Sequence, residues 1–167
     1  MSIIVSQDAP SVERLYHEHR RPIQAYLARM VGDREAAEDL CQETFLKALR
    51  GWERHGPIAS PVAWLYRIAA NTAYDHLRRW RARGSLASPD DLDAACCDFT
   101  PEGALAEGEA VRSALAQLPR RYREPLLMHA CAGLSLREIA DALGCSSDAA
   151  KMRLFRARRR FREVYRA

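Results

Sequence analysis

Apolar residues recur three or four positions apart along most of the chain, and no segment shows the strict alternation of a half-buried strand. The positions of the first apolar stripe are Ile23, Tyr26, Leu27 and Met30. A second stripe follows Asp33, a residue suited to cap a helix, and ends where Gly56 and Pro57 break the pattern. Its inward positions are predicted to be Ala36, Ala37, Leu40, Thr44, Phe45, Ala48 and Trp52. The pattern therefore predicts two consecutive α-helices.

A third helix is predicted from Ser60 onward. Serine is a favoured N-cap, and Pro61 then takes the first helical position, where proline is well tolerated. The spacing that follows predicts burial of Leu65, Ile68, Ala69, Thr72, Ala73, Leu77 and Trp80. Together with the two preceding helices, this segment makes residues 1–83 a first helical domain.

The helical periodicity stops at Gly84 and resumes near Glu109. The segment between them is acidic: residues 84–110 contain seven Asp and Glu but no Lys or Arg, which is typical of a tether. Beyond it, one short helix stops at Pro119, and another runs from about 122 to 132 and ends at Gly133. The chain is therefore predicted to be all-α, with two small helical domains, residues 1–83 and 109–167, joined by a flexible acidic linker over residues 84–108.

A helix-turn-helix is predicted within the second domain. Ser135 and Glu138 have the spacing of a capping box, in which each side chain bonds the backbone N–H of the other residue. Gly144 takes the position just past the end of this helix, where glycine is common. A three-residue turn, 145–147, then leads into a strongly basic last helix. A short helix, a turn that contains glycine and a basic second helix are typical of DNA-binding helix-turn-helix domains.

The last helix carries its apolar stripe on one side, at Ala150, Leu154, Ala157 and Phe161. The leading turns of a recognition helix meet base edges in the major groove, and cations further out meet phosphates. We therefore predict base contacts from Lys151, Met152, Phe155 and Arg156. We predict phosphate contacts from Arg153, Arg159 and Arg160. Taken alone, this helix could also be a solvated basic helix of a bundle.

The net charge of +4 is unevenly distributed along the chain. Residues 1–83 carry a net charge of +3, residues 84–110 carry −7, and residues 111–167 carry +8. Two basic blocks around an acidic segment are typical of a protein with a polyanionic partner.

Several classes of protein and site are disfavoured. No apolar run reaches membrane-spanning length and the N-terminus lacks a secretory signal, so we expect a cytoplasmic protein. The five cysteines have irregular spacing and predict neither a disulfide framework nor a metal site, although a redox role for adjacent Cys96 and Cys97 is an alternative. Neighbouring residues such as Asp75 and His76 do not face each other on a helix. We therefore expect no catalytic residues, no metal, no cofactor and no small-molecule substrate.

Three segments, in this order, resemble an extracytoplasmic-function (ECF, group IV) sigma factor of the sigma-70 family. They are DLCQETFLKALRGW at 39–52, WLYRIAANTAYDHLRR at 64–79 and LPRRYREPLLMHACAGLSLREIADALGCSSDAAKMRLFRARRRF at 118–161. The resemblance covers nearly the whole chain apart from the acidic segment. It implies a sigma-2 domain and a sigma-4 domain, no enzymatic activity, and RNA polymerase core and promoter DNA as partners.

The resemblance assigns one face of the second helix to RNA polymerase core. Residues three or four apart share a helical face, and a polar stripe with one leucine suits a protein interface. The residues of this face are Asp39, Gln42, Glu43, Leu46, Lys47 and Arg50. The implied contacts on the polymerase are the clamp helices of the β′ subunit, and the β flap is a further expected contact. Without the other motifs, a solvated face with i,i+4 ion pairs would explain the same pattern.

The third helix is expected to bind the opened −10 element. Cations can hold the backbone of a separated strand, while polar and aromatic side chains receive unstacked bases. The residues expected to do so lie away from the buried stripe, at Arg67, Asn71, Tyr74, Arg78 and Arg79. In the family, a flipped base enters a pocket at the end of the preceding helix, which here implies Gly51, Trp52 and His55.

Two departures from the family leave the promoter sequence open. The family often has an aromatic residue in the loop where this chain has His55, and Met152 replaces a residue that could donate a hydrogen bond. Trp64 and Trp80 are expected in the core and not as base platforms.

Two further expectations concern partners and an alternative function. Many relatives are held inactive by an anti-sigma factor, so the resemblance implies one here. The alternative is a free-standing helix-turn-helix regulator whose N-terminal bundle serves dimerisation or sensing. The segment Asp39–Arg50 favours the sigma factor, because a free-standing regulator needs no polymerase-binding face.

Overall fold

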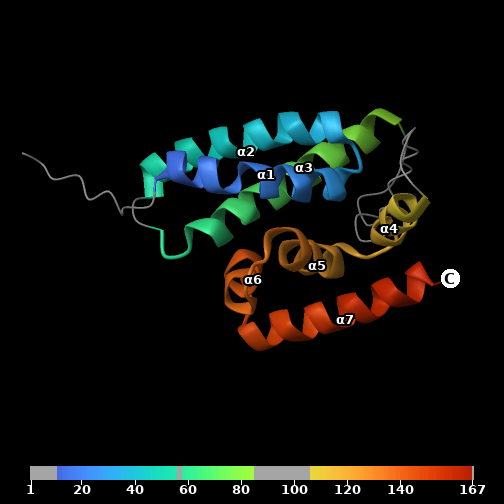
Figure 1. The fold of residues 1–167 in the computed structure, drawn as a ribbon. Helices are drawn as coiled ribbons and strands as arrows, with labels where there is room; N and C mark the ends of the chain where they lie inside the picture. Colours follow the sequence, from blue (N-terminus) through green and yellow to red (C-terminus); the bar gives the residue numbers. More distant parts are fainter. Residues whose placement is uncertain (1–10, 56–57, 85–105, 167) are drawn as a thin grey trace, which may run out of the picture.

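The structure is a computed structural model that describes residues 11–55, 58–84 and 106–166, and all regular secondary structure in these ranges is helical (Figure 1). The N-terminal part forms α1 (Val12–Val31), α2 (Arg34–His55) and α3 (Pro61–Gly84). The C-terminal part forms α4 (Ala106–Ala116), α5 (Arg120–Ala132), α6 (Leu136–Leu143) and α7 (Ser147–Tyr165). The prediction of an all-α chain is therefore confirmed. Most of the predicted linker, residues 85–105, lies outside the described residues.

Local signals set the helix ends of the N-terminal bundle. Ser11 caps the start of α1, and Gly32 ends this helix with a left-handed backbone (φ 77°) that glycine adopts without steric cost. Asp33 then accepts hydrogen bonds from the backbone N–H groups of Glu35 and Ala36 at 2.9 and 3.1 Å. The predicted cap of α2 is therefore present.

The bundle core lies between α1, α2 and α3, and it buries the predicted stripes of the first two helices almost completely. The largest of its fully buried side chains are Tyr26, Tyr66, Ile23, Leu27, Met30 and Leu65. The prediction that Trp80 is buried was wrong, because its side chain is 53% exposed. Leu77 is the last buried residue of α3, and the final turns of this helix extend past α2 (Figure 1). The indole of Trp80 is therefore not part of the buried core.

The C-terminal part contains the predicted helix-turn-helix, formed by α6 and α7. The capping box is complete: Ser135 Oγ accepts from the backbone N–H of Glu138 at 3.3 Å, and the Glu138 carboxylate accepts from the Ser135 backbone N–H at 2.8 Å. Gly144 closes α6 in the left-handed region (φ 63°). Ser146 then caps α7 by accepting from the backbone N–H of Ala149 at 3.2 Å.

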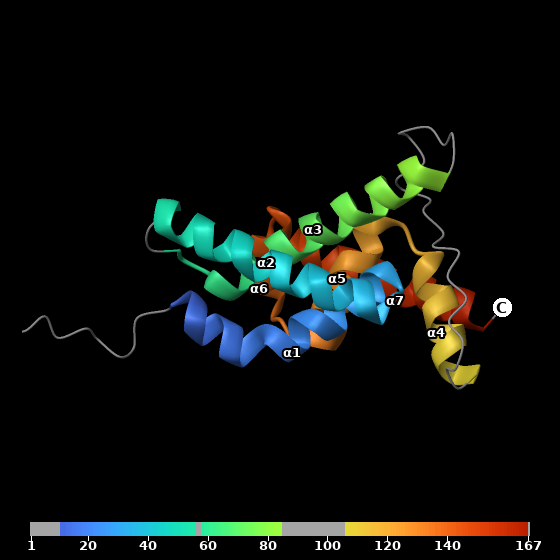
Figure 2. The ribbon, with the colours of Figure 1, turned by 90° about the horizontal axis from the view of Figure 1, so that it is seen from above.

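The two parts also pack against each other. Helix α5 lies against α1, and α6 lies against α3 (Figures 1 and 2). One cluster of buried apolar side chains continues from the bundle into the C-terminal part, where it includes Leu127, Met128 and Ile139. The sequence predicted two tethered domains and gave no sign of this shared interface.

Candidate nucleic-acid interface

Helix α7 presents six of the seven residues predicted for the −35 duplex as exposed side chains. They are Lys151, Met152, Phe155, Arg156, Arg159 and Arg160. The opposite side of the helix is fixed by buried Ala150, Leu154 and Ala157. Met152 and Phe155 are large apolar side chains that remain 47% and 59% exposed, which is unusual for a helix with no partner on that side. This face therefore combines cations with uncovered apolar groups.

Three arginines of α7 already have acidic neighbours. The Arg153 side chain is half-buried and lies near the carboxylate of Glu124 on α5. Burial raises the pKa of Glu124, while the guanidinium groups of Arg120 and Arg153 oppose this rise. Arg159 and Arg160 both pair with Glu163, at 3.0 and 3.4 Å, on the exposed surface. Exposed ion pairs of this kind are weak, so a phosphate could replace Glu163. Arg153 differs from these two arginines because its side chain is half-buried.

Helix α3 carries the residues predicted for the opened strand on one side. Arg67, Asn71, Tyr74 and Arg78 lie four, three and four positions apart, so they form one stripe. Asn71 and Arg78 are exposed, and Arg78 pairs with Asp75. The neighbouring Arg79 is exposed as well, and its guanidinium lies 4.0 Å from Glu43 of α2.

Two members of this stripe contact the C-terminal part. The Arg67 guanidinium donates to the backbone carbonyls of Asp141 and Ala142 in the last turn of α6, with an Nε to Ala142 oxygen distance of 3.0 Å. The Arg120 guanidinium of α5 lies over the ring of Tyr74, 3.7 Å from its centroid. Arg67 nevertheless stays exposed, as do Asn71 and Arg78, and Tyr74 is the half-buried member of the stripe.

The predicted base pocket lies at the junction of α2 and α3. Trp52 and Trp64 are half-buried and pack against each other, with ring centroids 5.9 Å apart. Gly51 is half-buried beside Trp52 on the last turns of α2. The side chain of His55 and residues 56–57 lie outside what the structure describes. The role of Gly51, Trp52 and His55 as a base pocket stays a prediction.

The predicted polymerase-binding face of α2 is split by the structure. Asp39, Gln42, Leu46 and Arg50 are exposed along one side of the helix. Leu46 is 54% exposed, and Leu49, which the sequence analysis did not include, is 49% exposed beside it. Two leucines therefore stand uncovered between polar side chains, which is the composition of a protein interface.

The other two residues of that face point toward α3. Lys47 pairs with Glu43 at 2.7 Å and donates to the hydroxyl of buried Thr72 at 3.2 Å. Arg79 approaches the same glutamate from α3. Glu43 and Lys47 thus connect the two helices, and a contact with a partner would have to share them with this network.

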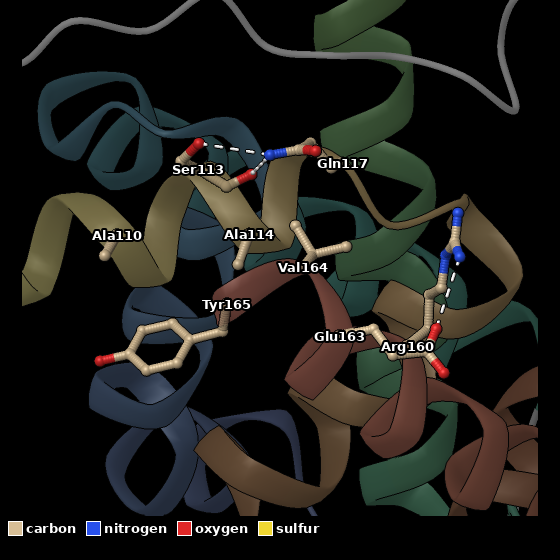
Figure 3. A pocket seen from close by; sticks show the side chains of 8 residues that line it. All are labelled: Ala110, Ser113, Ala114, Gln117, Arg160, Glu163, Val164 and Tyr165. Carbon is tan, nitrogen blue, oxygen red and sulfur yellow. Dashed lines mark hydrogen bonds and ion pairs between the residues drawn. The ribbon is translucent and has the colours of Figure 1, made fainter. Parts of the chain in front are cut away.

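An open cleft of about 610 Å³ lies between α4 and α7 (Figure 3). Its walls include Ala110, Ala114, Val164 and the Arg160–Glu163 pair. Gln117, just past the end of α4, donates to the hydroxyl of Ser113. The polar groups satisfy each other and do not converge on a common point. In the part of the chain that the structure describes, no His, Cys, Asp or Glu cluster could hold a metal ion.

Residues 15–83 match the sequence model of sigma-70 region 2, and residues 108–161 match that of sigma-70 region 4. The chain belongs to the sigma-70 family of sigma factors. Like its relatives, this sigma factor directs RNA polymerase to promoters. The matches favour this function over a free-standing helix-turn-helix regulator.

Curated relatives place this sigma factor in the ECF group. It is 35% identical over 159 residues to RNA polymerase sigma factor CarQ of Myxococcus xanthus, covering 95% of this chain and 90% of that protein. It is 34% identical to ECF RNA polymerase sigma factor SigL of Mycobacterium tuberculosis, covering 93% of this chain and 89% of that protein. The resemblance drawn from the three sequence segments is therefore confirmed.

Solved structures share the two-domain helical fold. CnrH in complex with the cytosolic domain of CnrY matches with a TM-score of 0.69 and 25% identity, covering 92% of this chain and 86% of that one. The sigma factor RpoE in complex with the anti-sigma factor NepR from Bartonella quintana matches with a TM-score of 0.68 and 23% identity, covering 93% and 96% of the two chains.

Some residues at the junction of the two parts were missed by sequence reasoning. Arg120 and Glu124 form a 3.1 Å ion pair on α5, and an i,i+4 pair could have been predicted from their spacing. Nothing in the local sequence indicates that Arg120 also covers Tyr74, because the two residues lie on helices far apart in the chain. The described helices include none long and apolar enough to span a membrane.

Proposed function

We propose that this sigma factor distributes the three tasks of transcription initiation over three helices. Helix α2 binds RNA polymerase core, α3 holds the opened −10 element, and α7 reads the −35 duplex. In this assignment residues 1–83 act as the sigma-2 domain, residues 109–167 act as the sigma-4 domain, and residues 84–108 link them. The observation that carries the proposal is that α7 exposes six predicted DNA contacts above a buried apolar stripe, in a chain that also exposes a mixed polar and apolar face on α2.

The contact with polymerase core rests on exposed Asp39, Gln42, Leu46 and Arg50. Leucines that stand half-exposed among charged groups become the buried anchor of an interface, and the charged groups form its rim. We assign this face to the clamp helices of the β′ subunit, and the sigma-4 domain to the β flap. Glu43 and Lys47 form an ion pair beside this face, and Lys47 also donates to the Thr72 hydroxyl of α3.

The contact with the −35 duplex rests on α7. Lys151 and Arg156 reach base edges and donate hydrogen bonds there, while Arg159 and Arg160 bind phosphates. Met152 and Phe155 cannot donate hydrogen bonds, so they contact apolar base groups such as the thymine methyl. Arg153 contributes less to binding of the −35 duplex, because its side chain is half-buried near Glu124.

The contact with the −10 element rests on α3 and the end of α2. Asn71 and Arg78 are exposed and bind the separated strand, and a flipped base enters near Gly51, Trp52 and His55. The half-buried ring of Trp52 packs against Trp64, and we assign this pair to the floor of the pocket.

Further parts of the proposal follow from the family. Sigma factors are not enzymes, and we assign this chain no reaction of its own. It acts in the cytoplasm, where RNA polymerase meets the genome. The structural relatives RpoE and CnrH were solved with NepR, an anti-sigma factor, and with CnrY. We propose that an anti-sigma factor also controls this chain.

Run-off transcription tests the proposal. Purified chain is added to bacterial RNA polymerase core on a library of bacterial genome fragments, with core alone and chain alone as controls. We expect discrete transcripts only when both are present, and the fragments that yield them identify the promoters. The proposal is refuted if no fragment supports a transcript that depends on this chain, or if the isolated chain alone binds specific duplexes with nanomolar affinity at physiological salt.

A further inference from the structure

Two large apolar side chains stand uncovered on the leading half of α7. Met152 is 47% exposed and Phe155 is 59% exposed. The core of the C-terminal part does not need them, because Ala150, Leu154 and Ala157 supply the buried side of the same helix. An apolar patch that stays uncovered on a folded domain marks a binding surface more often than chance.

The cations beside this patch indicate nucleic acid as the partner that covers it. Lys151 and Arg156 are both exposed next to the two apolar side chains. Within the described ranges, neither of them forms an ion pair with a carboxylate, so both can meet phosphates or base edges. The exposed leucines of α2 differ, because the paired charges of Glu43 and Lys47 lie beside them.

The spacing of Met152 and Phe155 suits the step between neighbouring base pairs. Residues three apart are separated by about 4.5 Å along a helix axis, at about 1.5 Å per residue. Neighbouring base pairs are separated by about 3.4 Å along the duplex. Both side chains can therefore reach neighbouring base pairs in one major groove. Of the four bases, thymine alone presents a methyl group there, on its C5 carbon.

Asp148 adds a carboxylate to the same face of α7. It is exposed and lies four residues before Met152, and residues four apart are neighbours on a helical surface. In the part of the chain that the structure describes, this carboxylate has no ion-pair partner. Phosphates repel a carboxylate in the major groove, so it needs a base that donates to it, and the amino groups of cytosine and adenine are such donors.

The amino group of cytosine lies next to its C5 carbon. Unmethylated cytosine therefore offers a donor to Asp148 but no methyl group to Met152. Thymine offers the methyl group, but its O4 is an acceptor and faces the carboxylate without a hydrogen bond. A cytosine that carries a methyl group on C5 satisfies both side chains.

We propose that Asp148, Met152 and Phe155 make promoter recognition by this sigma factor sensitive to C5 methylation of pyrimidines, with 5-methylcytosine as the favoured base at Asp148 and Met152. This inference rests on the proposed role of α7 in binding the −35 duplex and names a further group that it recognises. Methylation of a cytosine within the −35 element then raises the affinity of the holoenzyme for that promoter.

A pyrimidine scan of promoter DNA tests the proposal. Holoenzyme is assembled from core polymerase and the full chain, and the promoter is one that run-off transcription identifies. At each position of its −35 element, on each strand in turn, synthetic duplexes carry cytosine, 5-methylcytosine, thymine or uracil with the proper complement. Cytosine and 5-methylcytosine differ by one methyl group, and so do uracil and thymine. Competition against the labelled promoter measures the affinity for each duplex.

Methylated pyrimidines should bind more tightly at one or two neighbouring positions. Burial of one methyl group is expected to tighten binding by about three- to fourfold. At the position that faces Asp148, 5-methylcytosine should bind most tightly of the four bases. Asp148→Asn should keep the methyl effect and lose the preference for 5-methylcytosine over thymine, because an amide can also donate to thymine O4.

Two variants of α7 show whether the methyl effect belongs to the patch. Met152→Ala combined with Phe155→Ala should abolish it. Tyr165→Ala is the matched control, because it removes another exposed apolar side chain (44%) from the end of the same helix, and it should keep the effect. Helical circular dichroism checks the fold of each variant, and the scan with the wild type needs no variant.

The proposal is overturned if the wild type shows no methyl effect of at least twofold at any position. It is also overturned if the effect persists in the folded double variant, because DNA shape would then be its source. Equal binding of thymine and 5-methylcytosine at every position would refute the role of Asp148. Absence of any transcript in the run-off assay refutes the proposed function, whereas transcripts without a methyl effect refute this inference alone.

Discussion

The double replacement Leu46→Ala with Leu49→Ala should weaken binding to RNA polymerase core without weakening the fold. Full burial of a leucine side chain contributes about 1.5–3 kcal/mol. Leu46 is 54% exposed and Leu49 is 49% exposed, so about half of each side chain remains to be buried by a partner. Each leucine can therefore contribute about 1 kcal/mol to the complex, and the pair about 2 kcal/mol. This corresponds to about a 30-fold rise in Kd.

The same exposure predicts that the fold is unaffected. Surface replacements away from buried networks usually change the free energy of unfolding by less than about 0.5 kcal/mol. Alanine is also a good helix former, so α2 should stay intact. The midpoint of thermal unfolding, followed by circular dichroism, should therefore stay close to that of the wild type.

Equilibrium binding of fluorescently labelled chain to purified core measures the effect directly. Phe155→Ala is the matched control, because it removes an equally exposed apolar side chain from the DNA-facing side of α7. It should leave the affinity for core unchanged and lower transcription from −35-dependent promoters. A double leucine variant that binds core within twofold of the wild type would refute the assignment of α2, as would an equal loss in the Phe155 variant.

Three further predictions concern DNA contacts and the helix-turn-helix. Lys151→Ala should reduce the discrimination of the −35 sequence from other sequences by about 1–3 kcal/mol. Arg159→Ala should weaken binding to all sequences and lower the slope of log K against log salt concentration by about one. Titrations at several salt concentrations measure both effects, and equal effects of the two variants would contradict the division into base and phosphate contacts. Asn71→Ala should impair open-complex formation more than initial promoter binding, which permanganate footprinting resolves; the prediction fails if both steps weaken together. Hydrogen bonds from the Ser135 hydroxyl and backbone N–H hold the pKa of Glu138 below its usual value. The Glu138 carboxylate therefore stabilises the folded state fully at pH values above its unfolded pKa of about 4.3. This stabilisation is lost as the pH falls through the folded pKa of Glu138. Glu138→Gln should therefore lower the free energy of unfolding by about 1 kcal/mol at neutral pH. It should also weaken the loss of stability toward acid pH, measured by urea unfolding at several pH values. If that pH dependence is unaltered in the variant, the Glu138 carboxylate is not its source.

Sequence reasoning succeeded where the signal was local. The capping box of Ser135 and Glu138 and the left-handed Gly144 each depend on residues within four positions of one another. For the start of α7, the sequence left Ser146 and Ser147 as alternative caps, and the structure uses Ser146. Such short-range chemistry fixes the ends of α6 and α7 before any tertiary contact is considered. The outward face of α7 followed from its apolar stripe in the same way.

Sequence reasoning failed where tertiary contacts decide. The periodicity of α3 continues through Trp80, but burial also requires a neighbouring helix, and Leu77 is the last described residue of α3 that is buried. Periodicity likewise placed Lys47 on an outward face, although its long side chain reaches across to Thr72 on α3. The contact of Arg120 with Tyr74 joins residues 46 positions apart, and no local pattern encodes it.

The polar contacts around α3 differ in kind on its two sides. On the α2 side, Lys47 and Thr72 form a hydrogen bond between two helices of the N-terminal bundle. The apolar cluster beside them continues across α3 into the C-terminal part, so the polar contacts alone distinguish the two sides. On the α6 side, Arg67 and Tyr74 make contacts that a phosphate and a base can replace with groups of equivalent chemistry.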